Sequence, residues 1–240
     1  VENPIIQGLP DVKPEERVRE LKRLTGRMIG INLEPVESGY ESADPDSMWK
    51  MSPGRVATLE NAVKACEMGV DMVLLTGNPG TGVSNQAITD TLRLLKKELG
   101  DRLILAAGKM HASGILSEAG EHIITRRDVE EFIGAGADIV LFPAPGTVPG
   151  ITMEYVRGLV TEAHSRNVLT MTSIGTSQEG ADAETIRQIA LMCKMAGTDI
   201  HHVGDSGYTG IAIPENITAY SKVIRGTRHT YRRMALSVNR

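Results

Sequence analysis

Aromatic residues, cysteines and long apolar runs are scarce in this sequence, and each scarcity excludes a class of protein. Five Tyr, two Phe and one Trp among 240 residues leave a core that must be mainly aliphatic. No uninterrupted apolar run approaches the roughly 20 residues that a membrane-spanning helix needs, so we expect no membrane partner. The formal net charge of −4 lacks the positive excess that general nucleic-acid binding favours, so we expect no nucleic-acid partner.

The two cysteines and the first residues bear on the cellular compartment. Cys66 and Cys193 lie far apart without CxxC spacing, which is typical of buried thiols in a reducing cytosol. The opening residues Val1–Pro4 have neither the basic nor the apolar region of a signal peptide. We therefore expect a cytoplasmic protein.

Short aliphatic runs alternate with amphipathic helical stretches along the chain, which is the pattern of βα units and a parallel sheet. The predicted strands are Met28–Leu33, Met72–Thr76, Leu103–Ala107, Ile139–Phe142, Val168–Thr172 and Ile200–Val203. The predicted helices are Pro14–Thr25, Arg55–Met68, Asn85–Leu99, Arg126–Gly134, Met153–Arg166, Ala183–Ala196 and one from Pro214 into the 230s. No linker or low-complexity tract divides these elements, so we expect one domain over residues 1–240.

One short phrase recurs before three of the predicted strands. The segments Met68–Asp71, Gly134–Asp138 and Met195–Asp199 all end in Gly-x-Asp. Glycine is the usual terminator of a helix that ends in a left-handed residue. The sequence therefore predicts the same helix-to-strand turn at three places.

Two folds are compatible with six parallel strands: an eight-stranded TIM (β/α)8-type barrel that lacks two strands, and an open, doubly wound sheet. In the open sheet, ligand-binding loops gather where the strand order reverses. In a barrel, every strand delivers a loop to one shared face. Nearly every predicted strand here is followed by a specialised Gly-rich, Pro-rich or polar segment, whereas the helix-to-strand turns are short. This asymmetry favours the barrel over the doubly wound sheet.

The number of visible strands makes a further prediction about the barrel. Only six strands are visible, the segment Ile5–Asp11 is similar to a loop that leads from a strand into a helix, and no initiator Met is present. We therefore expect the first two strands of the barrel to be absent from this chain, which would make the domain incomplete on its N-terminal side.

Glycine-rich segments follow the last two predicted strands. In a TIM barrel the loops after strands seven and eight bind phosphate, because glycine lets backbone N–H groups approach an anion closely. The residues that we expect to bind phosphate are Gly175, Thr176, Ser177, Gly204, Ser206 and Gly207.

These segments resemble those of the ribulose-phosphate-binding barrels, the group that contains phosphoribosyl-anthranilate isomerase and indole-glycerol-phosphate synthase. The stretches Asn3–Ile6, Gly30–Pro35 and His202–Tyr208 are similar to an uncharacterised bacterial (β/α)8-barrel family without a settled activity. The resemblance spans the whole chain. It implies a barrel in which two strands precede the segment Val1–Asp11.

Four titratable side chains at strand exits are candidates for catalysis. Lys109 and His111 follow the third predicted strand on one side, and a lysine in a barrel mouth either forms a Schiff base or binds an anion as a cation. Glu34 ends the first predicted strand and is a candidate general base. His202, rather than its neighbour His201, is in phase with the barrel interior. The alternatives are a solvated rim lysine, an exposed loop acid and a core histidine bonded to the backbone.

Polar residues near the same exits are candidates for substrate binding. Asn32 shares a face with Glu34, and Asp205 follows the last predicted strand. Asn78 and Thr81 lie in a Gly-rich segment that either cradles a polar group of the substrate or only shapes a turn.

A divalent metal is the one cofactor that the sequence leaves open. No GxGxxG sequence follows a predicted strand, so we expect no dinucleotide cofactor. The candidate metal ligands are Glu34, His111, His202 and Asp205, an N/O set suited to Zn, Mn or Mg, although none has local metal-ligand spacing.

Together these features predict an enzyme that acts on a small phosphorylated, sugar-like metabolite by proton transfer, lyase or isomerase chemistry. Two alternatives stay open. One is a divalent-metal-dependent lyase or mutase of a small carboxylate or phosphonate. The other is a non-catalytic phosphosugar sensor that signals through the basic C-terminal helix around Arg225 and Arg232. We expect the protein to form a homo-oligomer.

Overall fold

The computed structural model describes residues 12–37, 39, 52–111, 115–175, 178–204 and 212–236. Five of the expected site residues lie outside this part of the chain: Thr176, Ser177, Asp205, Ser206 and Gly207. The segment Ile5–Asp11 also lies outside it.

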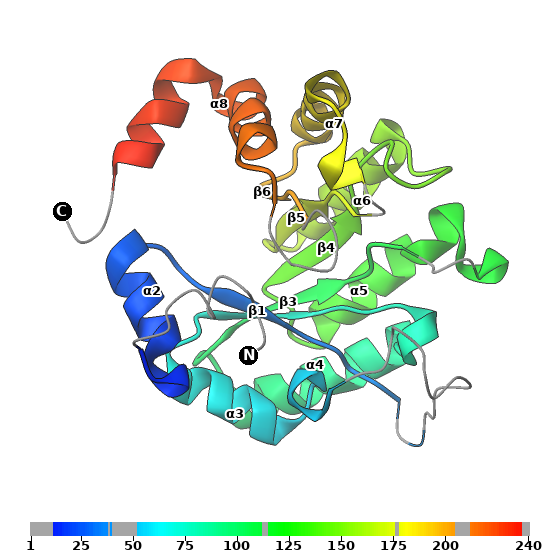
Figure 1. Cartoon of the computed structure of the whole chain (residues 1–240). Coiled ribbons are helices and arrows are strands. Elements are labelled where there is room, and N and C mark those ends of the chain that lie inside the picture. The colour runs from blue at the N-terminus through cyan, green and yellow to red at the C-terminus, as the bar shows by residue number, and fades with distance from the viewer. Residues whose placement is uncertain are drawn as a thin grey trace.

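Six parallel strands form one curled sheet (Figure 1). They are β1 (Gly30–Leu33), β2 (Met72–Leu75), β3 (Ile104–Gly108), β4 (Ile139–Pro143), β5 (Leu169–Ser173) and β6 (Ile200–His202). They pair in chain order, whereas a doubly wound sheet reverses its order at a switch point, so the doubly wound alternative is wrong. Among the described residues β1 pairs with β2 alone and β6 with β5 alone, so the sheet is a half-barrel with two open edges.

The helices α3 to α7 follow one another around the outer side of this sheet (Figure 1). The described α-helices are α2 (Arg17–Thr25), α3 (Leu59–Met68), α4 (Asn85–Leu99), α5 (Arg126–Gly134), α6 (Met153–Ser165), α7 (Ala183–Ala196) and α8 (Pro214–Ala235). Short 3-10 turns lie at Pro14–Glu16, Pro53–Arg55, Pro79–Thr81, Leu116–Glu118, Gly120–Ile123 and Gln178–Gly180. None of the described helices is both long and apolar enough to cross a membrane.

Side-chain caps explain which helix bounds are confirmed. The predicted bounds of α4, α5 and α7 are confirmed, and each helix begins after a residue whose side chain accepts a backbone N–H of the first turn: Ser84, Thr125 and Asp182. The helix predicted to begin at Arg55 instead begins at Leu59. The Thr58 side chain caps this helix by accepting the N–H of Asn61. A capping side chain fixes where the helical backbone starts, so the helix begins directly after Thr58.

The N-terminal elements are shorter and more exposed than predicted. β1 begins at Gly30 rather than Met28, and Met28 is 62% exposed. On α2, Val18 is buried, but Leu24 is 56% exposed.

The strands β3 and β5 each lie one residue later than predicted. Apolar alternation cannot fix these ends, because the last ladder hydrogen bond depends on the neighbouring strand.

The two faces of the sheet pack differently. The outer face, with Val73, Leu105 and Val140, joins the helices in the main hydrophobic core. The inner face holds a smaller apolar cluster made of strand residues: Leu74, Ala106, Ile139, Leu141 and Met171. Because side chains alternate along a strand, the next inward positions beyond this cluster lie at the carboxyl ends of the strands.

The three Gly-x-Asp turns use one hydrogen-bonding scheme, which confirms the predicted repeat. Gly69, Gly136 and Gly197 all have positive φ, at 90°, 105° and 90°. The aspartate that follows accepts a backbone N–H from the preceding strand or the residue just before it: Ile29 to Asp71, Leu105 to Asp138 and Thr170 to Asp199. The distances are 2.8, 2.9 and 2.8 Å. The turn therefore ties the amino ends of neighbouring strands together.

Each of the same aspartates also binds a basic side chain from an outer helix. The pairs are Lys22–Asp71 at 2.7 Å, Lys96–Asp138 at 3.4 Å and His164–Asp199 at 2.8 Å. The donors come from α2, α4 and α6, so the scheme repeats once for every two strands. Burial by itself would raise the pKa of Asp199, but the hydrogen bonds from His164 and Thr170 outweigh it and lower that pKa. The amino end of the sheet is thus a structural edge.

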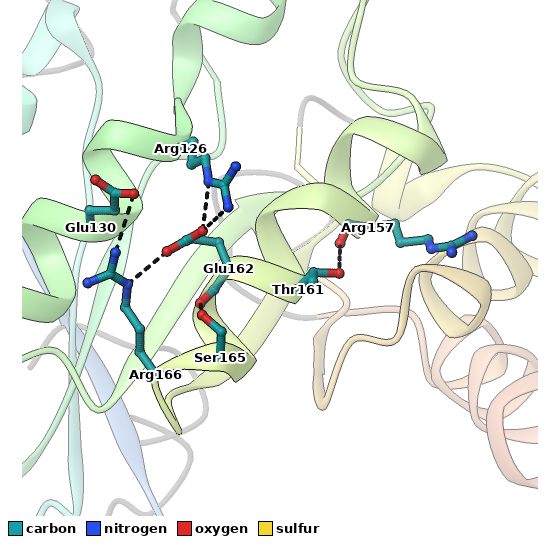
Figure 2. A network of polar contacts seen from close by, with 7 residues as sticks. All are labelled: Arg126, Glu130, Arg157, Thr161, Glu162, Ser165 and Arg166. Carbon is teal, nitrogen blue, oxygen red and sulfur yellow. Dashed lines mark hydrogen bonds and ion pairs between the residues drawn. The ribbon is translucent and has the colours of Figure 1, made fainter.

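A network of ion pairs joins α5 to α6 on the outer side (Figure 2). The Glu162 carboxylate accepts from Arg126 and from Arg166, and Arg166 also reaches Glu130 at 3.3 Å. Hydrogen bonds from Arg166 and Arg126 lower the pKa of Glu162. The network links neighbouring helices around the half-barrel.

The last helix bends and its end lies beside the start of the sheet. Gly226 has φ 75° and ψ 164°, which interrupts the helical backbone of α8. Beyond the bend, the Arg27 guanidinium donates to the carbonyl of Arg233 at 2.8 Å and to that of Leu236. The end of α8 therefore lies beside the segment that precedes β1 (Figure 1).

Candidate active site at the carboxyl ends of the strands

Most described candidate residues lie at one edge of the sheet. Glu34 follows β1, Asn78 and Thr81 follow β2, Lys109 and His111 follow β3, Gly175 follows β5, and His202 and Gly204 lie at the end of β6. All strands are parallel, so these positions share the carboxyl edge. In TIM-type enzymes this edge holds the active site, whereas the opposite edge serves stability.

Glu34 is a buried carboxylate rather than an exposed loop acid. Its backbone bridges to Val56, with its N–H donating to the Arg55 carbonyl at 2.8 Å. Its side chain accepts from the Arg55 guanidinium. Burial raises the pKa of Glu34 above its usual value, and Arg55 and the Thr81 hydroxyl offset only part of that rise. A carboxyl group with a raised pKa suits proton transfer near neutral pH.

Asn78 and Thr81 shape the turn after β2 and also lie against Glu34. The Thr81 hydroxyl donates to the Asn78 carbonyl at 2.9 Å and accepts the Asn78 N–H at 3.3 Å. The same hydroxyl interacts with Glu34. The turn is therefore confirmed, and the cradle for a polar group of the substrate stays a prediction.

Lys109 is among the largest fully buried side chains of the described residues, at 2% exposure. The alternative of a solvated rim lysine is therefore wrong. Lys109 directly follows Gly108, where β3 and β4 approach so closely that a Cβ would lie 2.1 Å from the Leu141 carbonyl oxygen. His111 is half-buried, and burial lowers the pKa of its imidazole below 6.5, which keeps it neutral at pH 7.

Met110, between the two candidate residues, contacts β5. Its sulfur lies 2.9 Å from the Ser173 Oγ, and its side chain packs against the inner apolar cluster. Gly175 lies close by, since a Cβ there would be 3.7 Å from the Met110 Cβ. The exits of β3 and β5 are therefore adjacent across the inner face.

Ser173 and Gly204 hold the His202 imidazole. The Ser173 Oγ lies 2.8 Å from His202 Nδ1, and the Gly204 N–H donates to the same nitrogen at 3.2 Å. A nitrogen that accepts a backbone N–H carries no proton, so neutral His202 has its proton on Nε2. His202 is thus bonded to a backbone N–H, as its core alternative expects, and it also lies at the mouth.

Gly204 has a steric reason to be glycine that sequence reasoning did not supply. Its φ is 72°, and a Cβ would lie 2.2 Å from the Ile174 carbonyl oxygen. The nearest side-chain atom is the Cβ of Glu179, at 3.2 Å. Glu179 is a buried acid after β5, and no motif in the sequence distinguishes it from an exposed loop acid. The exits of β5 and β6 therefore pack directly on one another.

Hydrogen bonds of the described residues bring the candidates together in two groups. One joins Glu34 to Asn78 and Thr81, and the other joins His202 to Ser173 and Met110. Asn32 is exposed on the open inner side of β1. Ser173 and Met110 were missed because neither residue type carries a charge, although Ser173 is in phase with Gly175 along β5.

The predicted metal ligands do not assemble among the residues that the structure describes. No group of three His, Cys, Asp or Glu side chains suited to a metal ion occurs in this part of the chain. The described ligands Glu34, His111 and His202 belong to different strand exits.

Comparison with known proteins adds a family and a fold. A family model described as "Domain of unknown function (DUF7916)" matches residues 1–240. The chain belongs to this family. No curated protein matches the sequence.

One similar solved structure is the deoxyribose phosphate aldolase from Aeropyrum pernix, which is described as a unique tetrameric structure. The TM-score is 0.52 and the sequence identity is 15%, over 93% of this chain and 80% of that chain. The likeness confirms the predicted TIM-type α/β fold for this DUF7916 member. The narrower resemblance to ribulose-phosphate-binding barrels stays a prediction.

Proposed function

We propose that the chain is an enzyme that performs lyase or isomerase chemistry on a small phosphorylated, sugar-like carbonyl compound. The observation that carries this proposal is the burial of Lys109 just beyond the carboxyl end of β3, where the strand has ended and alternation no longer fixes a side chain's direction, on the same edge as His111, Glu34 and His202. The similar fold of an aldolase that acts on deoxyribose phosphate supports the same reaction class.

Lys109 is the candidate nucleophile. A buried amine that loses its proton attacks a substrate carbonyl carbon, and loss of water then gives an iminium ion. The iminium withdraws electrons, so that a proton or a neighbouring carbon fragment leaves the adjacent position without its bonding electron pair. If Lys109 keeps its proton, it instead binds the substrate's phosphate or carboxylate as a cation.

Glu34, His111 and His202 are the candidate proton carriers. The pKa of Glu34 is raised and that of His111 is lowered, both by burial. Opposite shifts of this kind suit an acid and a base that work at the same pH. His202 carries its proton on Nε2 when neutral, so it serves as a hydrogen-bond donor to a substrate oxygen.

Phosphate binding is proposed for the exits of β5 and β6. Gly175 and Gly204 are the described members of this set, and the β5 and β6 exits pack on one another at Gly204. The Gly204 N–H already donates to His202 Nδ1, so the donors proposed for the phosphate oxygens are other backbone N–H groups of these glycine-rich exits.

Reduction with sodium borohydride tests the role of Lys109. The chain is incubated with dihydroxyacetone phosphate or ribose 5-phosphate, reduced, digested and analysed by mass spectrometry. We expect an adduct on the peptide that contains Lys109, and none in Lys109→Met. Turnover without an adduct would assign the cationic role to Lys109. If neither probe binds or reacts, the proposed function is wrong.

We also propose that the protein self-associates. Exposed apolar side chains lie on both sides of the Arg27 contact with the end of α8: Leu24, Met28, Met234 and Leu236. The similar aldolase is a tetramer. Light scattering coupled to size-exclusion chromatography tests this, and a monomer at micromolar concentration would contradict it.

A further inference from the structure

Two buried polar atoms after β2 form no hydrogen bond of normal length and angle with the described residues, although the Asn78 side chain faces the Thr81 N–H in a capping arrangement. They are Oγ1 of Thr76, in a residue that is 3% exposed, and Oδ1 of Asn78, in a residue that is 5% exposed. Buried polar groups are almost always paired, because an unpaired one loses its hydrogen bonds to water without replacement. Two such atoms two residues apart, at the edge that carries the candidate active site, are suited to hydrogen bonds with a ligand.

The sheet register places Thr76 beside Glu34. Leu33 pairs with Leu75, and the Thr76 N–H continues the ladder to the Leu33 carbonyl at 3.4 Å. Leu33 and Leu75 both belong to the outer core, so alternation directs Glu34 and Thr76 to the inner face. The helices α3 to α7 cover the opposite, outer face (Figure 1).

Asn78 joins the same corner through Thr81. The Thr81 hydroxyl bonds to the Asn78 backbone on one side and interacts with Glu34 on the other. The buried carboxyl, amide and hydroxyl groups of Glu34, Asn78 and Thr76 therefore lie at neighbouring exits of β1 and β2. Thr76 was not among the residues singled out by sequence, because a threonine at the end of a strand has no distinctive pattern.

Charge accounting identifies the chemistry that fits this corner. The Glu34 carboxylate is already paired with the Arg55 guanidinium, so the corner presents no unbalanced charge to attract a phosphate or an ammonium ion. The unmet capacity consists of one amide acceptor oxygen and one hydroxyl, which both donates and accepts. An alcohol group matches this set, since it donates to an amide oxygen and accepts from a hydroxyl.

We propose that Thr76, Asn78 and Glu34 form a subsite for the hydroxyl groups of a polyhydroxylated, sugar-like ligand. The subsite lies at the β1 and β2 exits, apart from the proposed phosphate position at the β5 and β6 exits. This inference rests on the proposed function for its ligand class, and it orients the ligand: hydroxyl-bearing carbons at β1 and β2, phosphate at β5 and β6. Both atoms are buried, so a ligand without hydroxyl groups would leave them without a hydrogen bond and would bind more weakly.

The test compares three probes by calorimetry: inorganic phosphate, propyl phosphate and glycerol 3-phosphate. The last two have the same carbon number and differ by two hydroxyls. For the unsubstituted chain we expect glycerol 3-phosphate to bind about 3- to 10-fold more tightly than propyl phosphate, which is the yield of one net hydrogen bond. In Thr76→Val this preference should fall toward one, while inorganic phosphate binds unchanged.

Thermal unfolding without ligand separates a binding role from a structural one. Thr76→Val has the shape of threonine without the unpaired hydroxyl, so the melting temperature should stay the same or rise. The matched control is Thr170→Val, which removes a buried hydroxyl that donates to Asp199 at 2.7 Å and should lower the melting temperature. If Thr76→Val does not fold, Thr76→Ser and Thr76→Ala are compared instead. The ratio of their affinities for glycerol 3-phosphate then measures the contribution of the hydroxyl.

The outcomes distinguish this inference from the proposed function. If phosphate and propyl phosphate bind but glycerol 3-phosphate gains nothing, the subsite is wrong and the proposed function stands. If Thr76→Val lowers the melting temperature as much as Thr170→Val does, the hydroxyl is structural and the subsite is again wrong. If no phosphorylated probe binds the unsubstituted chain, the proposed function fails and the subsite fails with it.

Discussion

The Oγ of Ser173 lies 2.8 Å from Nδ1 of His202, and the two residues are registered partners on β5 and β6. The pairing of the strands therefore brings a hydroxyl to the imidazole without any loop. Because the Gly204 N–H also donates to Nδ1, the imidazole is held from two sides with its proton on Nε2. Support of this kind fixes both the tautomer and the ring orientation of a histidine.

Replacing Ser173 by Ala should loosen the His202 tautomer. In the unsubstituted chain, ¹⁵N NMR at neutral pH should show an unprotonated Nδ1 and a protonated Nε2 for His202. Ser173→Ala should give a mixed or broadened pattern, because one of the two groups on Nδ1 is gone. Ser173→Thr keeps the hydroxyl and is the control. A proton on Nδ1 in the unsubstituted chain would contradict the assignment.

Replacing Gly204 by Ala should destabilise the protein strongly. The new Cβ would lie 2.2 Å from a backbone oxygen at a φ of 72°, so the backbone must move, at a cost of at least about 1–3 kcal/mol. Urea unfolding measures the difference. Gly158→Ala is the control: Gly158 lies within α6 with open space at its Cβ, so alanine should stabilise the chain by about 0.5–1 kcal/mol. Equal effects of the two substitutions would contradict the steric argument.

Stability should fall as the pH drops from about 6.5 to about 4, in part because of His201. Burial, followed by the charge of Arg225, lowers the pKa of His201 from 6.5 to about 4, while Asp199 acts in the opposite direction. The Nδ1 atom lies 3.1 Å from the Tyr220 hydroxyl, and Tyr220 also interacts with Cys193. In this pH range the unfolded chain binds a proton at His201 that the folded chain does not, so falling pH favours unfolding.

Urea unfolding at pH 7, 6 and 5 measures this dependence on His201. His201→Asn, which keeps an acceptor atom but does not titrate, should show a shallower decline than the unsubstituted chain. His111, whose pKa burial also lowers, remains in both proteins and does not affect the difference. Parallel declines in the two proteins would show that His201 is protonated in the folded state.

Replacing Asp199 by Ala should cost about 2–3 kcal/mol of stability. The change removes the acceptor of both the N–H and the hydroxyl of Thr170, a fully buried residue, and buried donors without acceptors are costly. Asp90→Ala is the matched control, since Asp90 is exposed and its ion pair is with Arg93, three residues along the same helix. Its loss should change stability by less than about 0.5 kcal/mol. A similar cost at both positions would contradict the role assigned to the Gly-x-Asp turn.

Local signals in the sequence predicted most of the elements. The bounds of α4, α5 and α7 follow from caps within one turn of each helix, and the three Gly-x-Asp turns follow from a repeated phrase. The start of α3 was predicted wrongly because Arg55 belongs to a separate 3-10 turn, whose backbone bonds to Glu34 just after β1. Glu34 and Arg55 lie 21 positions apart in the chain, and both their backbones and their side chains are hydrogen-bonded to each other. Patterns in a local window do not contain these bonds.

By itself the sequence determined that parallel strands alternate with helices and that polar residues gather where strands end, because both depend on periodicity and on turn residues. The tertiary structure alone decided that Lys109 is buried rather than solvated and that Glu34 pairs with Arg55. It also decided which uncharged residues matter: Ser173 through its register with His202, and Thr76 through its register beside Glu34. Burial and lateral register arise when strands from distant parts of the chain are placed side by side. For that reason no single segment encodes them.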